Sequence, residues 1–195
     1  MVIASPAAAK ALLREPLRAA RREAAKSGTD AAEIAAAGFP ADRLIDFKIV
    51  AGYRAHGSEI DPWPLMRRFA EAGAQLALPA ATALDAPLVF RAYAPGDGLA
   101  PDVAGMAAPL GAAPALVPDL VIVPLLGFDA GGGRVGQGGG HYDRTLQALR
   151  AAGPVFALGL AYAAQAVARI PAEAHDQRLE AILTEKGYRL AQEEF

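Results

Sequence analysis

The 195-residue sequence has no cysteine, no excess of positive charge and no long apolar run. Without cysteine, the chain has no disulfide framework, no thiolate nucleophile and no cysteine-ligated zinc. The formal net charge of −2 argues against a nucleic-acid partner recruited by a positive field. No window reaches the roughly 18–20 apolar residues of a membrane span, and the opening residues lack the apolar core of a signal peptide. We therefore expect a cytoplasmic protein with neither a nucleic-acid nor a membrane partner.

What the sequence does contain fits one globular domain over residues 1–195, because 53% of the residues are apolar and 21% are charged. A helix is predicted over residues 6–26 and is expected to pack on this domain. Pro6 suits its first turn, and Ser27-Gly28 ends it. A narrow apolar stripe is predicted along it, formed by Leu12, Leu13, Leu17 and Ala20.

The rest of the chain alternates between helical and strand-like segments. Helices are predicted over 30–37, 61–72 and 142–152, and strands over 74–80, 87–93, 118–126, 155–162 and, as a pair or a strand and turn, 181–190. The run "PDLVIVPLL" (118–126) is typical of a parallel strand covered on both faces. Residues 42–56 fit a helix or a strand, and 94–114 are expected to form a Gly/Pro loop. The alternation predicts an α/β fold, a three-layer α/β/α sandwich with a mostly parallel central sheet, Rossmann-like.

The predicted helix over 61–72 has the clearest signals of its own. Asp61 is expected to be its N-cap and Pro62 its first residue. Its inward face is expected to consist of Leu65, Met66 and Phe69.

A glycine-rich block follows the strongest strand: Gly127 to Gly140 holds eight glycines in fourteen residues. Open α/β sheets bind ligands at such strand-to-helix connections. Glycine amides and a helix start form a cradle for an anion, Arg134 offers a cation for phosphate, and Asp143 offers a carboxylate for magnesium. On glycine content alone, a mobile turn with a solvated Arg134 is the simpler interpretation. The block is neither a Walker A loop nor a Rossmann fingerprint.

The order of features around this block resembles a known family signature. "PDLVIVPLLGFDAGGGRVGQGGGHYDRTL" is similar to that of the 5-formyltetrahydrofolate cyclo-ligase family: an apolar strand, Pro, a Gly-Phe-Asp turn, Arg, a glycine loop, an aromatic pair and Asp. "AAAKALLRE", "GSEIDPWPLMRRFAEAGAQLALPA", "LVFRAYAPGDGL" and "AHDQRLEAILTEKG" extend the resemblance from about Lys10 to Gly187. Two positions depart from it: Gly139, where some members have Lys, and His141, where many have Tyr or Phe.

The resemblance implies an ATP- and Mg²⁺-dependent cyclisation of 5-formyltetrahydrofolate to 5,10-methenyltetrahydrofolate, through a phosphorylated formyl (imino phosphate) intermediate, with release of ADP and phosphate. It implies a catalytic role for Arg134, His141 and Tyr142. It implies ATP contacts from Lys10, Arg14, Arg134, Val135, Gly136, Gln137, Gly138, Gly139, Gly140, His141 and Tyr142. The folate contacts that it implies are Arg54, Glu59, Gln137, Gly138, Gly139, Gly140 and His141. Its magnesium carboxylates correspond to Asp143 and Asp176.

Several alternatives stay open at this level. By themselves, Lys10 and Arg14 also fit a solvated basic helix face, and Glu59 also fits a lead-in to the next helix. Four aromatic residues fit either stacking on the folate or the core: Trp63, Phe90, Tyr93 and Tyr142. A non-catalytic folate or nucleotide binder, and an ATP-dependent phosphotransferase with another substrate, are the competing functions. We expect a monomer that acts on small molecules.

Overall fold

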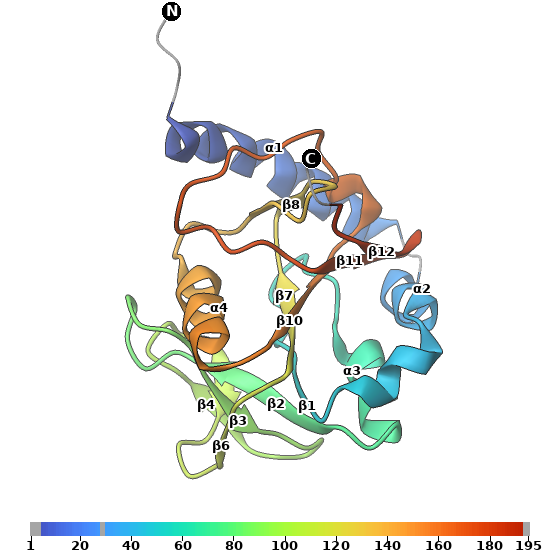
Figure 1. Cartoon of the computed structure of the whole chain (residues 1–195), viewed down its shortest axis with the longest axis vertical. Helices are drawn as coiled ribbons and strands as arrows, with labels where there is room; N and C mark the ends of the chain where they lie inside the picture. The colour runs from blue at the N-terminus through green and yellow to red at the C-terminus, as the bar shows by residue number, and fades with distance from the viewer. Residues whose placement is uncertain (1–4, 28–29, 193–195) are drawn as a thin grey trace, which may run out of the picture.

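An eight-stranded sheet forms the centre of the molecule in the computed structural model, which describes residues 5–27 and 30–192 (Figure 1). The strands lie in the order β12 (Gly187–Leu190), β11 (Ala181–Thr184), β10 (Phe156–Leu160), β7 (Leu120–Pro124), β1 (Ile49–Ala51), β2 (Gln75–Ala80), β3 (Val89–Ala92) and β6 (Ala115–Leu116). The strands from β11 to β2 are parallel, and β12, β3 and β6 add antiparallel edges.

Helices cover both faces of this sheet. On one face lie α2 (Ala31–Gly38), the 3₁₀ helix η1 (Ala41–Asp46) and α3 (Trp63–Glu71); α4 (His141–Ala152) lies on the other (Figure 1). The predicted three-layer, mostly parallel, Rossmann-like α/β fold is confirmed. Its parallel strands lie in the order β2-β1-β7-β10-β11, the flavodoxin-like variant of the doubly wound sheet.

Strand β7 explains why the sequence at 118–126 shows no alternation. Leu120 and Ile122 belong to the core beneath α2 and α3, whereas Val121 and Val123 belong to the core beneath α4. All four side chains are fully buried, so both faces of the strand require apolar residues.

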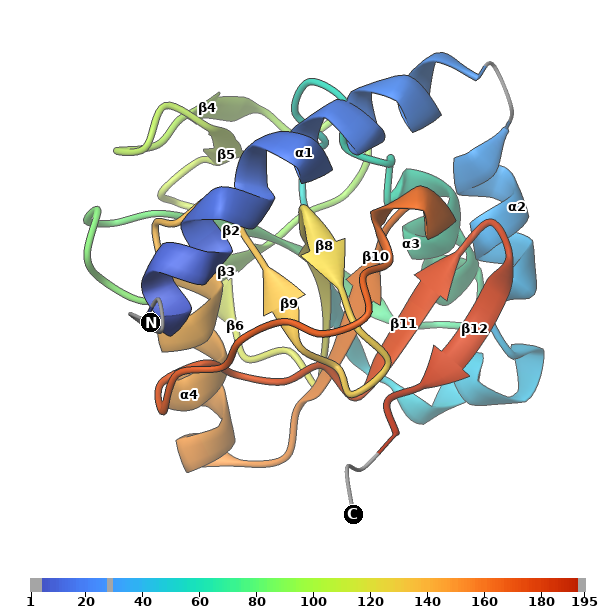
Figure 2. The same cartoon turned by 90° about the horizontal axis from the view of Figure 1, so that it is seen from above.

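Helix α1 (Pro6–Lys26) matches the predicted range and lies across the carboxyl ends of the parallel strands, above β8 (Gly127–Phe128) and β9 (Arg134–Val135) (Figure 2). Gly28, its predicted stop, lies outside the described residues. The predicted stripe is wrong at Leu12, which is 75% exposed. Leu17 instead packs so closely on Gly127 that a Cβ there would lie 2.5 Å from Leu17 Cδ1. The helix is therefore seated on the glycine-rich block.

Smaller differences have local causes. Helix α3 begins at Trp63, whose N–H is accepted by the Asp61 carboxylate (3.0 Å), and Pro62 occupies the N-cap position. Its inward residues Leu65, Met66 and Phe69 are buried as predicted. The ambiguous segment 42–56 is divided between η1 and β1. The Gly/Pro segment 94–114 contains a hairpin, formed by β4 (Leu99–Pro101) and β5 (Ala107–Pro109). The short η2 (Ala163–Gln165) follows β10.

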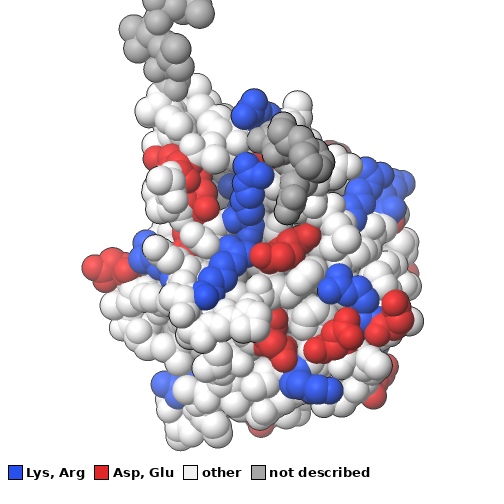
Figure 3. Space-filling model, viewed as in Figure 1, with Lys and Arg blue, Asp and Glu red and all other residues white. Residues whose placement is uncertain are grey.

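The surface carries both signs of charge. On the face seen in Figure 3, Lys and Arg side chains lie interspersed with Asp and Glu side chains. Among the described residues, no helix is both long and apolar enough to cross a membrane.

Candidate active site

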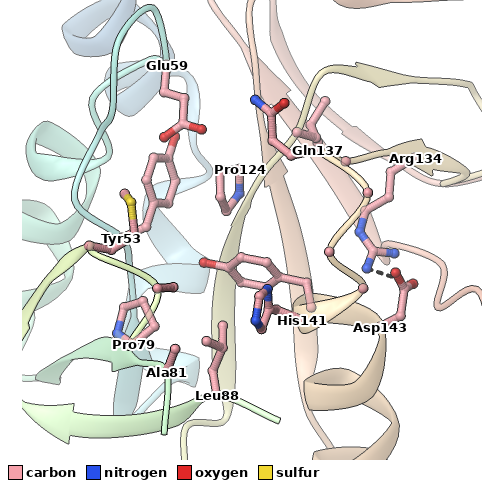
Figure 4. A pocket seen from close by; sticks show the side chains of 18 of the residues that line it. Tyr53, Glu59, Pro79, Ala81, Leu88, Pro124, Arg134, Gln137, His141 and Asp143 are labelled. Carbon is pink, nitrogen blue, oxygen red and sulfur yellow. Dashed lines mark hydrogen bonds and ion pairs between the residues drawn. The ribbon is translucent and has the colours of Figure 1, made fainter. Parts of the chain in front are cut away.

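A cavity of about 580 Å³ opens at the carboxyl ends of β1, β2 and β7. In doubly wound sheets, ligands bind where the strand order reverses, and here that point lies between β1 and β7. The segment after β1 supplies Tyr53 and Glu59 to one wall, and β7 ends in Pro124 at the back (Figure 4). Arg134 and Gln137 lie on the opposite wall (Figure 4). Topology thus brings two remote chain segments face to face.

Nearly all the residues proposed from the sequence line this cavity. They are Lys10, Arg14, Arg54, Glu59, Arg134, Gly136, Gln137, Gly138, Gly139, Gly140, His141, Tyr142, Asp143 and Asp176. The side chain of Val135 instead lies in a small core cluster with Leu17, Leu126 and Ile170. Val135 therefore fixes one end of the glycine loop, and its side chain has no contact with the cavity.

The glycine loop needs its glycines at specific positions. Gly138 (φ 106°) and Gly140 (φ 68°) have left-handed backbone conformations that side chains disfavour. Gly140 is the N-cap of α4, so the free amides and positive dipole end of this helix lie beside the loop. The Arg14 guanidinium packs on Gly138 and its Nε donates to the Gly136 carbonyl (3.1 Å). The arrangement suits a phosphate group.

Arg134 and Asp143 form an ion pair within the cavity wall. Arg134 Nη2 lies 2.9 Å from Asp143 Oδ1, and the same oxygen accepts the backbone N–H of Gln177 (3.0 Å; Figure 4 shows the ion pair). Arg134 Nη1 also donates to the Gln177 carbonyl. These contacts hold the Arg134 guanidinium in one orientation and join the start of α4 to the segment before β11.

Lys10 is largely buried and contacts two carboxylates from that same segment. Its ammonium lies 3.0 Å from Glu173 Oε2 and 2.5 Å from Asp176 Oδ2. Burial by itself lowers the pKa of Lys10, but the hydrogen bonds and charges of Asp176 and Glu173 outweigh it and raise this pKa. Burial acts to raise the pKa of Asp176, yet the bonds from Lys10 and the Glu173 N–H lower it. Both groups are therefore ionised at neutral pH.

Oxygen donors for a divalent cation are present on this side of the cavity. Donor atoms of Glu173, His175 and Asp176 lie within 4.8 Å of one another, and carboxylate oxygens are the ligands that Mg²⁺ prefers. Asp143 lines the same cavity. The oxygen donors of these residues fit a magnesium ion, although the Lys10 ammonium already contacts the carboxylates of Glu173 and Asp176. Glu173 and His175 were not predicted, because nothing in their local sequence links them to the glycine loop.

Two further arginines of α1 reach the site and were not predicted as site residues. Arg18 donates to the Gln137 side-chain oxygen (3.1 and 2.9 Å), and Arg21 contacts Ser58 and Glu59. Lys10, Arg14, Arg18 and Arg21 share one helix face, because they are spaced by three or four residues. That spacing is the signal that could have found them. Lys10 and Arg21 on this face are buried, whereas Arg14 and Arg18 are partly exposed, so the face is only partly the solvated one of the alternative.

Two tyrosines stand beside Glu59. Burial first, and then the negative charge of Glu59, raise the pKa of Tyr142 and of Tyr53 well above the usual range. The Tyr53 hydroxyl donates to the Ile60 carbonyl (2.6 Å), which fixes the segment after β1. Both phenols keep their protons at neutral pH. Tyr142 thus offers a neutral donor to the cavity.

His141 and the other aromatic residues differ in their surroundings. Nε2 of His141 is buried and has no hydrogen-bond partner among the described residues, and the imidazole lines the cavity. Such an atom is costly unless a ligand or water pairs with it. Phe90 is buried in the core, and Trp63 and Tyr93 pack against the core. For these three, the core alternative is the better description.

Fold and site together define an α/β protein with a cavity, lined by a glycine loop and by charged side chains of both signs, at the switch point of a doubly wound sheet. The chain belongs to the 5-formyltetrahydrofolate cyclo-ligase family, whose sequence profile matches residues 6–185.

The relatives span most of the chain. It is 31% identical to the 5-formyltetrahydrofolate cyclo-ligase of Mycolicibacterium smegmatis, over 91% of this chain and 94% of that protein. It is 34% identical to the Escherichia coli K12 cyclo-ligase, over 69% and 76%. Among solved structures, Aquifex aeolicus 5,10-methenyltetrahydrofolate synthetase matches with a TM-score of 0.71 at 24% identity, covering 95% and 94% of the two chains. That likeness establishes the fold.

Proposed function

We propose that this chain is an ATP- and Mg²⁺-dependent enzyme that closes 5-formyltetrahydrofolate to 5,10-methenyltetrahydrofolate, releasing ADP and phosphate. The observation that carries the proposal is the single cavity with two unlike walls. One wall presents a carboxylate, Glu59, suited to the paired N–H donors of a pterin. The other presents a glycine loop and fixed cations suited to phosphates. Membership of the 5-formyltetrahydrofolate cyclo-ligase family supports the choice of this folate as the substrate and of ring closure as the reaction.

The chemical difficulty is that a formyl oxygen is a poor leaving group. Its attack on the γ-phosphorus of ATP releases ADP and gives an imino phosphate. The neighbouring nitrogen, N10, then attacks the formyl carbon, and phosphate departs with that oxygen. Such steps depend on positioning and charge neutralisation, and they need no covalent nucleophile from the protein.

The residues of the chain supply these two requirements. Arg134 is held by Asp143 and by the Gln177 carbonyl, so its guanidinium is already oriented to neutralise phosphate charge. Tyr142 retains its proton and offers a hydrogen bond, and the unpaired Nε2 of His141 is a further polar contact for a ligand. Lys10 and Arg14 are the proposed ATP contacts on the α1 side: Arg14 packs against the glycine loop, and Lys10 lies between Glu173 and Asp176.

Asp143 and Asp176 are the proposed magnesium carboxylates. The ion, when bound, would neutralise phosphate charge and orient the triphosphate. Because Asp143 already contacts Arg134 and Asp176 already contacts Lys10, the metal ion would share each carboxylate with a cationic side chain of the protein. The proposal also includes action as a monomer in the cytoplasm, as the sequence leads us to expect.

Formation of the methenyl product, followed by its absorbance, tests the reaction. The purified protein is mixed with 5-formyltetrahydrofolate, Mg²⁺ and ATP, with an ATP-free control. Asp143→Ala should abolish the rise, whereas Asp85→Ala, which removes an exposed carboxylate outside the cavity, should preserve it. Folded wild-type protein that forms no product would overturn the enzymatic assignment. Calorimetry with folate and with ATP would then separate a silent binder from a phosphotransferase with another substrate.

A further inference from the structure

Arg21 fixes the carboxylate on the folate side of the cavity. Its side chain is only 8% exposed, and its Nη1 lies 3.3 Å from Glu59 Oε1. Its Nε donates to Ser58 Oγ (3.1 Å), the residue just before Glu59. The second carboxylate oxygen, Oε2, accepts the backbone N–H of His56 (3.0 Å). Each oxygen of Glu59 therefore has its own partner before any ligand binds.

We propose that Arg21 is a positioning residue for folate recognition: it holds the Glu59 carboxylate in the orientation that receives the N–H donors of the pterin. The inference rests on the proposed function, since that function assigns the pterin to Glu59. A free glutamate side chain loses rotamer entropy when a ligand orders it. A carboxylate that is already ordered by an arginine and a backbone amide avoids most of that cost.

A purely structural role for Arg21 makes a different prediction. The same helix carries Arg14, about two turns away, and Lys10, about three turns away. If Arg21 only anchored α1, its loss would displace the helix and weaken the ATP side as well. If Arg21 acts through Glu59, its loss weakens folate binding and leaves ATP binding unchanged.

Binding of each substrate by calorimetry separates these cases. Arg21→Gln should weaken 5-formyltetrahydrofolate binding by about ten-fold, the loss expected for one charge-assisted contact, and leave the ATP dissociation constant unchanged. Arg22→Gln is the matched control, because Arg22 is the next residue, is about half exposed and pairs with Glu15 on the surface. It removes the same charge and should change neither constant. In turnover, Arg21→Gln should raise the KM for folate more than it lowers kcat.

A double-mutant cycle tests whether the effect passes through Glu59. In a Glu59→Gln background, Arg21→Gln should produce little further loss of folate affinity. Arg21→Lys, which keeps the charge but lacks the planar guanidinium whose Nε and Nη1 reach Ser58 and Glu59, should give an intermediate loss and serves if Arg21→Gln does not fold.

The outcomes distinguish the two levels of the proposal. Wild-type protein that binds no folate overturns the proposed function, and with it the substrate named for Glu59. Wild-type protein that binds folate, with Arg21→Gln or Arg21→Lys binding it equally well, overturns the role of Arg21 alone. Equal weakening of folate and ATP binding, or additive losses in the cycle, would make Arg21 a structural anchor.

Discussion

Replacing two glycines of the same loop should separate the folding role of the loop from its ligand-binding role. Gly140 has φ 68° and is the N-cap of α4, whereas Gly136 has no positive φ and an added Cβ would meet nothing within 4 Å. Both residues line the cavity. Gly140→Ala therefore strains the backbone, and Gly136→Ala places a methyl group in open space.

The magnitudes follow from these conformations. An alanine in the left-handed region costs about 1–2 kcal/mol. In Gly140→Ala, the new Cβ would also lie 2.7 Å from Arg144 Nη1, the far end of a flexible side chain that can move. For a domain of this size, each kcal/mol lowers Tm by about 2–4 °C, so we expect a decrease of about 2–8 °C. Gly136→Ala should change Tm by less than about 2 °C, since surface changes without strain stay within about 0.5 kcal/mol.

Scanning calorimetry gives the two Tm values, and steady-state kinetics gives the KM for ATP. Because the Gly136 methyl group would occupy space that the proposed phosphate site requires, Gly136→Ala should raise the KM for ATP while the protein remains as stable as wild type. A Gly140→Ala protein with an unchanged Tm would refute the backbone argument. A Gly136→Ala protein that binds ATP normally would refute the placement of phosphate against this part of the loop.

Three further results are expected. Because Asp176 has a lowered pKa, its ion pair with Lys10 should stabilise the fold above pH 3.8 and lose this effect as the pH falls below that value. Urea unfolding at about pH 5 and about pH 3 gives the free energy of unfolding of the wild type and of Asp176→Asn, and the difference between the two proteins should shrink at the lower pH. A difference that stays constant would contradict the pairing. Tyr142→Phe should lower kcat on the order of a hundred-fold with stability within about 1 kcal/mol of wild type, and an undiminished kcat would remove Tyr142 from catalysis. Phe69→Ala removes a fully buried ring between α3 and the sheet and should lower the free energy of unfolding, measured with denaturant, by about 3–5 kcal/mol. A decrease below about 1 kcal/mol would mean that the neighbouring side chains move in and fill the space left by the ring.

Elements whose signals are local could be predicted from the sequence. The uninterrupted apolar run at 118–126 indicated β7, and the spacing of Leu65, Met66 and Phe69 indicated the buried face of α3. The glycine loop and the start of α4 were recognisable because glycine spacing and a helix start adjoin in the sequence. In each case, neighbouring residues carry the whole signal.

Features that depend on distant parts of the chain could not be predicted. Strand β1 has three residues, too few for a periodic pattern, and its identity depends on pairing with β2 and β7. Leu12 fits an apolar stripe in the sequence but is exposed in the structure. The side of α1 that faces the protein instead carries charged residues, because Lys10, Arg18 and Arg21 bind polar partners there: Asp176, Gln137 and Glu59. Glu173 and His175 reach the cavity only through the path of the segment before β11.

The pairing of β1 with β7 has a consequence for how the protein acquires its activity. Val50 pairs with Leu120, and the chain between them forms β2, α3 and the antiparallel edge of the sheet. Closing so long a loop is slow and entropically costly, so this contact belongs among the late events of folding. The cavity cannot exist before it, because the segments that follow these two strands supply the opposite walls. Folding intermediates should therefore gain no protection from ATP or folate, and a substrate added during refolding should slow unfolding of the finished protein without speeding its formation.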